Sequence, residues 1–329
     1  MSDPVVRTVL GDVPAADLAV TMAHEHLLMT GGWPVRAEPD FRLDSVDAAV
    51  SEVRAMVAAG GASLVEMTPL GFGRSPDGLA EVARQTGAHI VACTGFHKLG
   101  YYSDLHWLHH YSPEQIGGLL SDEIVDGMDR GGLEGPIVDR STARAGVVKL
   151  ATEYHRAGAV VERLAHAIGL AHRRTGVPVA THTETGTMGH EQLDLLEAAG
   201  VPAGAVVLGH IDHNPDPVYL AELASRGAFL AFDMPGRIKY APDSQSVELL
   251  GQLADRGHTG QLLLGSDLAR RSYWPALGGG PGLAYLLERF VPRARAAGLG
   301  EVTDAALVAN PARAFALRTV GSTPASEGP

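Results

Sequence analysis

The chain has 329 residues, of which 45% are hydrophobic and 5% aromatic, and its 26 Lys and Arg against 38 Asp and Glu give a formal charge of −12. This negative charge argues against nucleic acid or an anionic membrane as a partner, and we expect neither. A lone cysteine, Cys93, and a start without a basic and apolar export signal lead us to expect a protein of the reducing cytoplasm.

Apolar runs rich in β-branched residues alternate along the chain with longer segments of helical periodicity. This is the pattern of a parallel sheet covered by helices. The runs that we predict to be strands are 18–26, 62–69, 89–97, 145–152, 177–184, 205–212, 228–234 and 262–267. Helices are predicted between them, among others at 46–59, 158–175 and 244–256. The glycines expected to end helices before the next strand are Gly60, Gly87, Gly176, Gly200 and Gly227.

Strands that alternate with helices in this number predict one closed TIM (β/α)8 barrel, a fold of the α/β class. No segment has the composition of a linker, so we expect a single domain over residues 1–318 and a flexible tail over 319–329. In such barrels the carboxyl ends of the strands and the loops after them converge on one face, which carries the chemistry.

Side chains that can bind a metal stand at the carboxyl ends of several predicted strands. The first strand carries two imidazoles on one face, because side chains alternate with a period of two, and this leaves Glu25 on the other face. Each such residue alone is also compatible with an ordinary polar strand end. Together at one barrel mouth they predict a metal centre. The candidate ligands are His24, His26, His182, His210 and Asp267.

Lys149 lies inside the apolar sequence Val147-Val148-Lys149-Leu150 of the fourth predicted strand. A buried ammonium group is costly, and burial lowers the pKa of a lysine. A neutral lysine amine can add carbon dioxide, and the resulting carbamate offers two oxygens to metal ions. The alternative is an ordinary ion pair of Lys149 with a buried acid such as Glu66 or Asp233.

This ligand set resembles that of the phosphotriesterase family of the amidohydrolase superfamily, as do the segments 92–95, 183–189 and Asn310-Pro311. The resemblance spans nearly the whole chain. It implies two divalent metal ions, the more buried one held by His24, His26 and Asp267 and the more exposed one by His182 and His210. Lys149, carboxylated on Nζ, would bridge the two ions. We expect zinc first, and manganese, cobalt or iron as alternatives that such ligands also accept.

The resemblance also implies a hydrolase. A hydroxide that bridges the metals would attack the ester, because metal binding makes water acidic enough to ionise near neutral pH. Asp267 would be the catalytic residue that takes the hydroxide proton and passes it to the leaving oxygen. Opening of a lactone ring suits such a site. Similar proteins are commonly dimers, so a homodimer is expected.

The loops determine which ester is cut. After Gly95-Phe96 the chain has His97, where lactonases of this family carry a tyrosine that faces the substrate, and we expect His97 and Tyr102 to contact the substrate. Lys239, Arg270 and Tyr273, in the loops after the last two strands, are expected to bind a phosphate group. The alternative is that these residues are solvated or ion-paired with Asp243 or Glu248.

The same loop sequences resemble a branch of the family that hydrolyses five-carbon sugar lactones carrying a 5-phosphate. The leading hypothesis is therefore a two-metal lactonase for such a phosphorylated lactone. A phosphotriesterase, a general carboxylesterase or an unphosphorylated lactonase with the same metal site is the alternative. A catalytically silent metal-binding protein is a third hypothesis. Cys93, within a predicted strand, is expected to be an inert core thiol.

Overall fold

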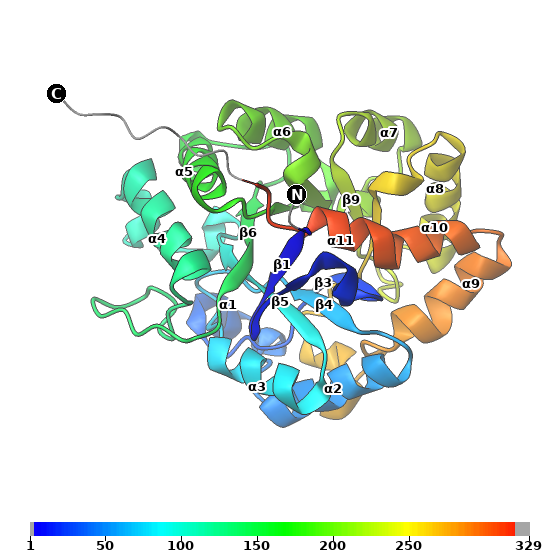
Figure 1. Ribbon diagram of the computed structural model, residues 1–329, viewed down its shortest axis with the longest axis horizontal. Coiled ribbons are helices and arrows are strands. Elements are labelled where there is room, and N and C mark those ends of the chain that lie inside the picture. The colour runs from blue at the N-terminus through cyan, green and yellow to red at the C-terminus, as the bar shows by residue number, and fades with distance from the viewer. Residues whose placement is uncertain (1–2, 320–329) are drawn as a thin grey trace.

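A computed structural model describes residues 3–319 of the chain. Its central sheet has eight strands in the order β10-β9-β8-β7-β6-β5-β4-β3, and neighbouring strands run parallel. The first and last strands of this order also meet, because the backbone N–H of Asp267, just after β10, donates to the carbonyl of His24 in β3 at 3.0 Å. The sheet thus closes into a TIM barrel surrounded by helices (Figure 1), and the predicted fold class is confirmed.

Every predicted strand is present, with somewhat shorter bounds than the sequence indicates. The barrel strands are β3 (Thr21–Glu25), β4 (Ser63–Glu66), β5 (His89–Gly95), β6 (Ala145–Ala151), β7 (Val179–His182), β8 (Val206–Gly209), β9 (Phe229–Phe232) and β10 (Leu262–Leu264).

The helices follow the strands around the barrel. They are α1 (Gly32–Ala37), α2 (Val46–Ala58), α3 (Pro76–Thr86), α4 (Pro113–Val125), α5 (Ala159–Thr175), α6 (Gly189–Ala198), α7 (Pro217–Ser225), α8 (Asp243–Asp255), α9 (Val291–Ala296), α10 (Gly300–Asp304) and α11 (Asn310–Ala314). All five glycines expected to end helices have positive φ at or just after a helix end, as in Gly87 (φ 73°) and Gly176 (φ 71°).

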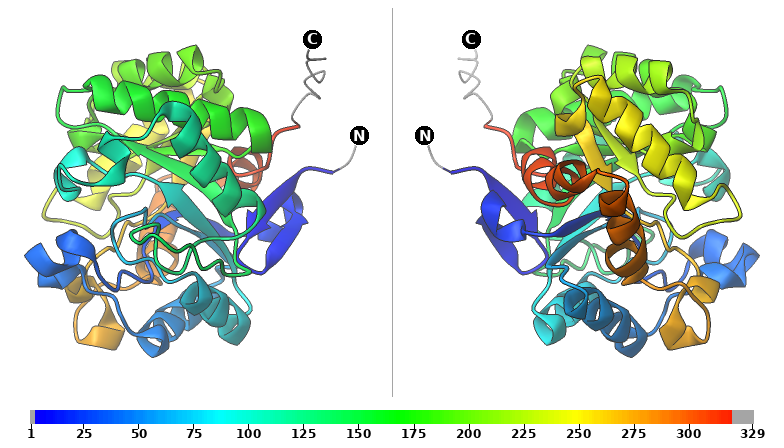
Figure 2. Two further views of the ribbon diagram at one scale, coloured as in Figure 1. Left: turned by 90° about the vertical axis from the view of Figure 1, so that its left-hand side faces the viewer. Right: turned by 90° about the vertical axis from the view of Figure 1, so that its right-hand side faces the viewer.

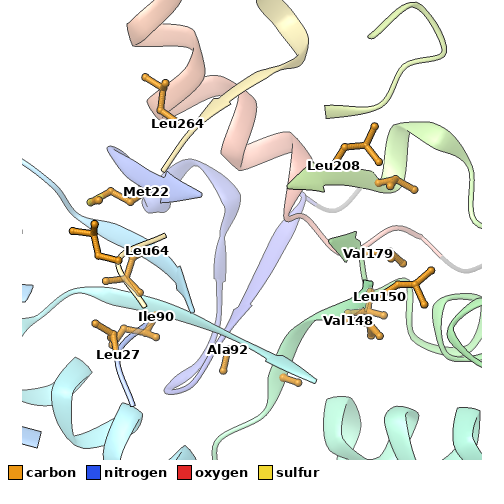
Figure 3. Close-up of a cluster of buried hydrophobic side chains, with 14 of the residues drawn as sticks. Met22, Leu27, Leu64, Ile90, Ala92, Val148, Leu150, Val179, Leu208 and Leu264 are labelled. Atoms are coloured by element: carbon orange, nitrogen blue, oxygen red, sulfur yellow. The ribbon is translucent and has the colours of Figure 1, made fainter. Parts of the chain in front are cut away.

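Two apolar layers form because side chains alternate between the faces of each strand. Met22, Leu64 and Val148 belong to the layer between sheet and helices, and Figure 3 shows side chains of this layer on several barrel strands. Val147 and Leu263, from the other face, belong to the cluster inside the barrel. The interior is therefore a packed core, and the polar groups lie at its ends.

A hairpin that the sequence analysis did not predict precedes the barrel. It consists of β1 (Val5–Thr8) and β2 (Gly11–Pro14), which pair antiparallel. The N–H of Val9 donates to the carbonyl of Ile90, near the start of β5, and Val6 packs with Phe315 in the interior cluster. The hairpin and the last helix thus close the amino-terminal end of the barrel, near the start and the end of the described chain (Figure 2).

The predicted tail, 319–329, falls outside the described residues from position 320 onward. No helix within residues 3–319 is both long enough and apolar enough to span a lipid bilayer.

Candidate metal centre

The first barrel strand contains an irregularity that directs its histidines. The pairing of β3 with β4 shifts between Met22, which is opposite Leu64, and Glu25, which is opposite Glu66. Such a bulge changes the direction of a side chain. His24 and His26 are both buried, and Nε2 of each lies near Oδ1 of Asp267, at 3.7 and 3.2 Å.

Asp233, which directly follows β9, connects two of the imidazoles. Its carboxylate lies 2.9 Å from Nδ1 of His24 and 2.8 Å from Nδ1 of His210, and it also accepts the backbone N–H of His210. A buried carboxylate beside an imidazole nitrogen favours a proton on that nitrogen. Nε2 of each ring then carries the lone pair, and Nε2 of His24 is buried with no hydrogen-bond partner.

His26 is oriented through a hydroxyl group. Its Nδ1 lies 2.9 Å from Oγ1 of Thr68, and this hydroxyl donates to the carboxylate of Glu66. Because the hydroxyl proton goes to Glu66, Thr68 can only accept from His26, which places the ring proton on Nδ1. The lone pair of His26 is therefore on Nε2, the atom that faces Asp267.

His182, the last residue of β7, has the opposite arrangement. Its Nε2 lies 3.3 Å from Oε2 of Glu184, and its Nδ1 is buried with no hydrogen-bond partner. Lys98 forms an ion pair of 2.5 Å with the same carboxylate oxygen. Burial and the neighbouring His210 lower the pKa of His182 to about 3, so this ring is neutral and able to bind a metal.

Lys149 in β6 is 1% exposed and donates to the carbonyl of Met67 at 3.1 Å. Among residues 3–319 no carboxylate forms an ion pair with it, so the alternative partners Glu66 and Asp233 are wrong: each is engaged with other groups. Burial lowers the pKa of this amine. Lys149 lines the same cavity as His182 and Asp267.

Asp267 has the left-handed backbone conformation (φ 47°), which an aspartate rarely adopts without support. Glu25 gives that support, because its buried carboxylate accepts the N–H groups on either side, from Ser266 at 2.8 Å and Leu268 at 3.4 Å. Glu25, which points away from the candidate ligands of its own strand, thus supports the loop that carries Asp267.

The two oxygens of Asp267 face different groups. Oδ1 faces the imidazoles of β3, and Oδ2 accepts from Nη1 of Arg237 at 2.7 Å. Burial opposes ionisation of this carboxyl, but the guanidinium of Arg237 and the nearby imidazoles hold its pKa well below the usual range. Asp267 is therefore an anion with one oxygen available to a cation.

These contacts fit a metal centre. In each of the four histidines a carboxylate or a hydroxyl lies beside one ring nitrogen. The other ring nitrogen then carries a lone pair that can bind a metal ion. One group of possible ligand atoms within 4.8 Å of one another is His24, His26 and Asp267, and His182 lies beside His210 with ring centroids 4.6 Å apart. The structure thus brings the predicted ligands together, and His210 lies close to both sets, because its ring centroid is also 4.8 Å from that of His24.

A cavity of about 210 Å³ opens above these residues. His97 lines it, with its ring 4.6 Å from that of His182 and stacked on Phe72. Tyr102 is not part of the lining. Its buried hydroxyl donates to the carbonyl of Leu70 and accepts the N–H of His97, so the structure gives it a supporting place, and Tyr101 lines the cavity.

Of the three residues expected to bind phosphate, two line the cavity, and Lys239 lies beside one of them without lining it. Tyr273 and Arg270 line the cavity, and the hydroxyl of Tyr273 is buried with no hydrogen-bond partner. Nζ of Lys239 lies 5.2 Å from the centre of the Tyr273 ring. Arg270 is ion-paired, but with Glu38 at 2.9 Å.

Asp243 and Glu248, the acids predicted as alternative partners, bind other groups. Asp243 accepts from the N–H of Gly236 and the hydroxyl of Tyr285, and Glu248 accepts from Gln252. The alternative prediction of an ion pair is therefore correct for Arg270. The acid, however, is Glu38, and not Asp243 or Glu248.

Sequence reasoning missed Arg237 and Asp233 as members of the site. Asp233 directly follows an apolar run, the same signal that identified Asp267, and Arg237 stands in the loop from which only Lys239 was selected. The signal was present for both. The imidazoles that Asp233 contacts and the Asp267 carboxylate that Arg237 contacts, however, come from other strands, so no local pattern distinguishes these two residues from other polar ones.

The fold and these contacts define a TIM barrel with a candidate metal centre at the carboxyl ends of its strands. Residues 4–315 match the model of the phosphotriesterase family. A phospho-furanose lactonase of Mycoplasmopsis synoviae is 35% identical over 96% of this chain and 93% of its own. The chain belongs to the phosphotriesterase family.

Solved structures of similar proteins have the same fold. An amidohydrolase from Mycoplasma synoviae is 33% identical and superposes with a TM-score of 0.94, over 97% of this chain and 93% of its own. The phosphotriesterase homology protein of Escherichia coli, complexed with phosphate in its active site, is 31% identical with a TM-score of 0.83, over 91% of this chain and 99% of its own. The recognition made from the ligand pattern is confirmed.

Proposed function

We propose that this protein is a metal-dependent hydrolase that opens the ring of a lactone, in particular a five-carbon sugar lactone that carries a phosphate group. The relatives that share most of its length include phospho-furanose lactonases, which supports a lactone as substrate. The single observation that carries the proposal is the convergence of the buried, unpartnered nitrogens of His24 and His182 with one oxygen of Asp267 beside a cavity that His182 and Asp267 line.

The ligands of two divalent ions, zinc in first place and otherwise manganese, cobalt or iron, would be His24, His26 and Asp267 on one side and His182 and His210 on the other. Such ions would supply Lewis acidity and an activated water. Lys149, carboxylated on Nζ, would bridge them, and its burial without an acidic partner supports this modification.

Asp267 is the proposed proton carrier. Its Oδ2 is held by Arg237, which keeps the carboxylate ionised and oriented, and its position at the cavity allows it to take a proton at the side where the ester binds. The left-handed turn supported by Glu25 keeps this carboxylate in place through the reaction.

The phosphate of the substrate would bind at the rim, to Arg270, Lys239 and the hydroxyl of Tyr273. A buried hydroxyl without a partner at a cavity wall is costly unless a ligand satisfies it, which supports a role for Tyr273. Tyr101 and His97 would form the wall against the sugar ring, and Tyr102 would hold the loop of His97.

The experiment is a screen of lactones and esters with a pH indicator, with and without a phosphate group, on protein of measured metal content. We expect turnover of five-carbon lactones and a strong preference for the phosphorylated form, which the variant Arg270→Ala loses while the rate with the unphosphorylated lactone stays nearly unchanged. Absence of hydrolysis across the panel by fully metal-loaded protein would favour the silent metal-binding hypothesis.

A second candidate is an unphosphorylated lactone or another neutral ester. The charge of Arg270 is already balanced by Glu38, and Met29, Phe41 and Phe72 give the cavity an apolar wall. If neutral esters are preferred and the variant Lys239→Met retains the full rate, this second candidate replaces the phosphorylated lactone.

A homodimer and a cytoplasmic location remain predictions of ours. The negative charge and the single buried cysteine are compatible with both. Sedimentation equilibrium measures the subunit number, and fractionation of cells that make the protein measures its location.

A further inference from the structure

The guanidinium of Arg270 lies over an aromatic ring at the rim of the cavity. The centre of its guanidinium lies 4.3 Å from the centre of the Phe41 ring. The face of an aromatic ring attracts a guanidinium, and the N–H donors of that guanidinium can still bind an anion. Nη2 forms an ion pair with Oε2 of Glu38 at 2.9 Å, and Nη1 lies 3.7 Å from Oδ2 of Asp40.

The loop that carries Glu38 is joined to the loop of Arg270 by other contacts. Asp40 accepts the N–H and the hydroxyl of Ser272 at 3.0 and 2.7 Å, and Arg271 donates to the carbonyl of Arg42 at 3.1 Å. These bonds connect the two loops whether or not Glu38 contacts Arg270. The ion pair of Glu38 is therefore not needed to hold the rim together.

An anionic group of a substrate needs the same donors that Glu38 occupies. The side chain of Glu38 is 52% exposed, and an ion pair exposed to this degree is weak. A phosphate group carries up to two negative charges and can accept from two guanidinium donors at once, so it competes well with a single carboxylate oxygen. A neutral substrate gains nothing by breaking the pair.

We propose that Glu38 is a specificity-determining residue, which occupies Arg270 until an anionic group of the substrate displaces it. This rests on the proposed function, because it takes Arg270 as a contact of the substrate's phosphate group. The consequence is that Glu38 raises the KM for a phosphorylated lactone and leaves the KM for the neutral lactone unchanged.

The test is the variant Glu38→Gln, assayed with a five-carbon lactone in its phosphorylated and unphosphorylated forms. We expect the KM for the phosphorylated form to fall about three- to fivefold, the effect of removing a weak exposed ion pair. The matched control is Glu153→Gln, which removes the same charge nearby, since Glu153 pairs with Arg156 and has no contact with Arg270. It should change neither KM.

Calorimetric titration of inorganic phosphate into the metal-free protein gives a readout that does not depend on turnover. Glu38→Gln should bind phosphate more tightly by the same factor, and in the background of Arg270→Ala this gain should disappear. A gain in phosphate affinity that persists without Arg270 would overturn the inference. The gain would then come from the loss of a negative charge near the site and not from N–H groups of Arg270 that Glu38 no longer occupies.

The lactone preferences of the wild type and the variants distinguish a failure of the proposed function from a failure of the inference about Glu38. If the wild type shows no preference for the phosphorylated lactone, the proposed function falls, and the role of Glu38 with it. If the wild type prefers that form but Arg270→Ala leaves the preference unchanged, Arg270 does not bind the substrate's phosphate, and the role of Glu38 is overturned while the proposed function stands. If Arg270→Ala removes the preference but Glu38→Gln does not lower the KM, the proposed function stands and the role of Glu38 is overturned. The melting temperatures of all variants identify any that fold poorly.

Discussion

Nη1 of Arg237 donates to Oδ2 of Asp267 at 2.7 Å, and Oδ1 of the same carboxylate lies 3.2 Å from Nε2 of His26. Arg237 is 6% exposed, and its second donor group binds the backbone and the carboxylate of Asp233. One buried guanidinium therefore holds two acids of the site, one proposed to bind metal and one that orients the histidines. Arg237 fixes where Asp267 points.

Arg237→Met is expected to lower kcat about ten- to a hundredfold, since a buried hydrogen bond to a charged group contributes about 1.5–3 kcal/mol. The measurement is steady-state kinetics on protein whose metal content equals that of the wild type. Arg237→Lys keeps the charge but not the pair of donors, and it should recover only part of the loss. An unchanged kcat in Arg237→Met would show that Asp267 needs no such orientation.

Lys149 gives a prediction for stability and metal content together. Lys149→Met removes a buried amine that has no acidic partner, so the metal-free protein should gain about 1–3 kcal/mol in its free energy of unfolding. Bound metal should drop sharply, because the bridge is lost. Urea unfolding and elemental analysis measure the two effects.

The smaller variant Lys149→Ala leaves space at this position. Added short carboxylates, such as formate or acetate, should restore part of its metal and activity, because a free carboxylate can replace the carbamate. Unchanged metal content in both variants would contradict the bridging role of Lys149.

Much of the fold could be predicted from the sequence because the parallel strands are buried on both faces, which leaves continuous apolar runs. The hairpin of β1 and β2 could not, since its strands are short and half-buried, with polar residues such as Arg7 and Asp12 facing outward. Local patterns indicate core strands well and edge hairpins poorly.

The candidate site also contains residues that local sequence patterns predict and residues that they do not predict. A side chain that can bind a metal at the end of an apolar run is a local signal, and it predicts His24, His182 and Asp267 as candidate ligands. The pair of Arg270 with Glu38 joins residues far apart in the sequence, so only the closed barrel brings them together. Tyr102 is predicted to contact the substrate, but Tyr101 lines the cavity instead, because side-chain directions in a loop are not determined by sequence spacing.

A buried ion pair outside the site gives a prediction about stability. Arg74 and Glu123 are almost completely buried and form two parallel hydrogen bonds of 2.9 and 2.7 Å. Glu123→Gln leaves an uncompensated guanidinium and should cost about 3–5 kcal/mol of the free energy of unfolding. The control is Glu81→Gln, whose exposed pair with Arg84 should be worth less than about 1 kcal/mol. Similar losses in both variants would contradict the account.

Cys93 provides a chemical test of the core. It is fully buried, and burial raises the pKa of its thiol to about 12, so near pH 8 only about one molecule in ten thousand carries the thiolate. The native protein should not react with a thiol reagent within the time in which the urea-unfolded protein reacts completely. Rapid labelling of the native protein would show that the interior of the barrel opens readily.

The central claim is that histidines from separate strands, Asp267 and a modified Lys149 hold two metal ions at the barrel mouth. Anomalous diffraction from crystals of the metal-loaded protein tests it most directly. We predict two peaks, one beside His24, His26 and Asp267 and one beside His182 and His210, with density for a carboxylate on Nζ of Lys149 between them. No peak at these residues, with an unmodified lysine, would contradict the account.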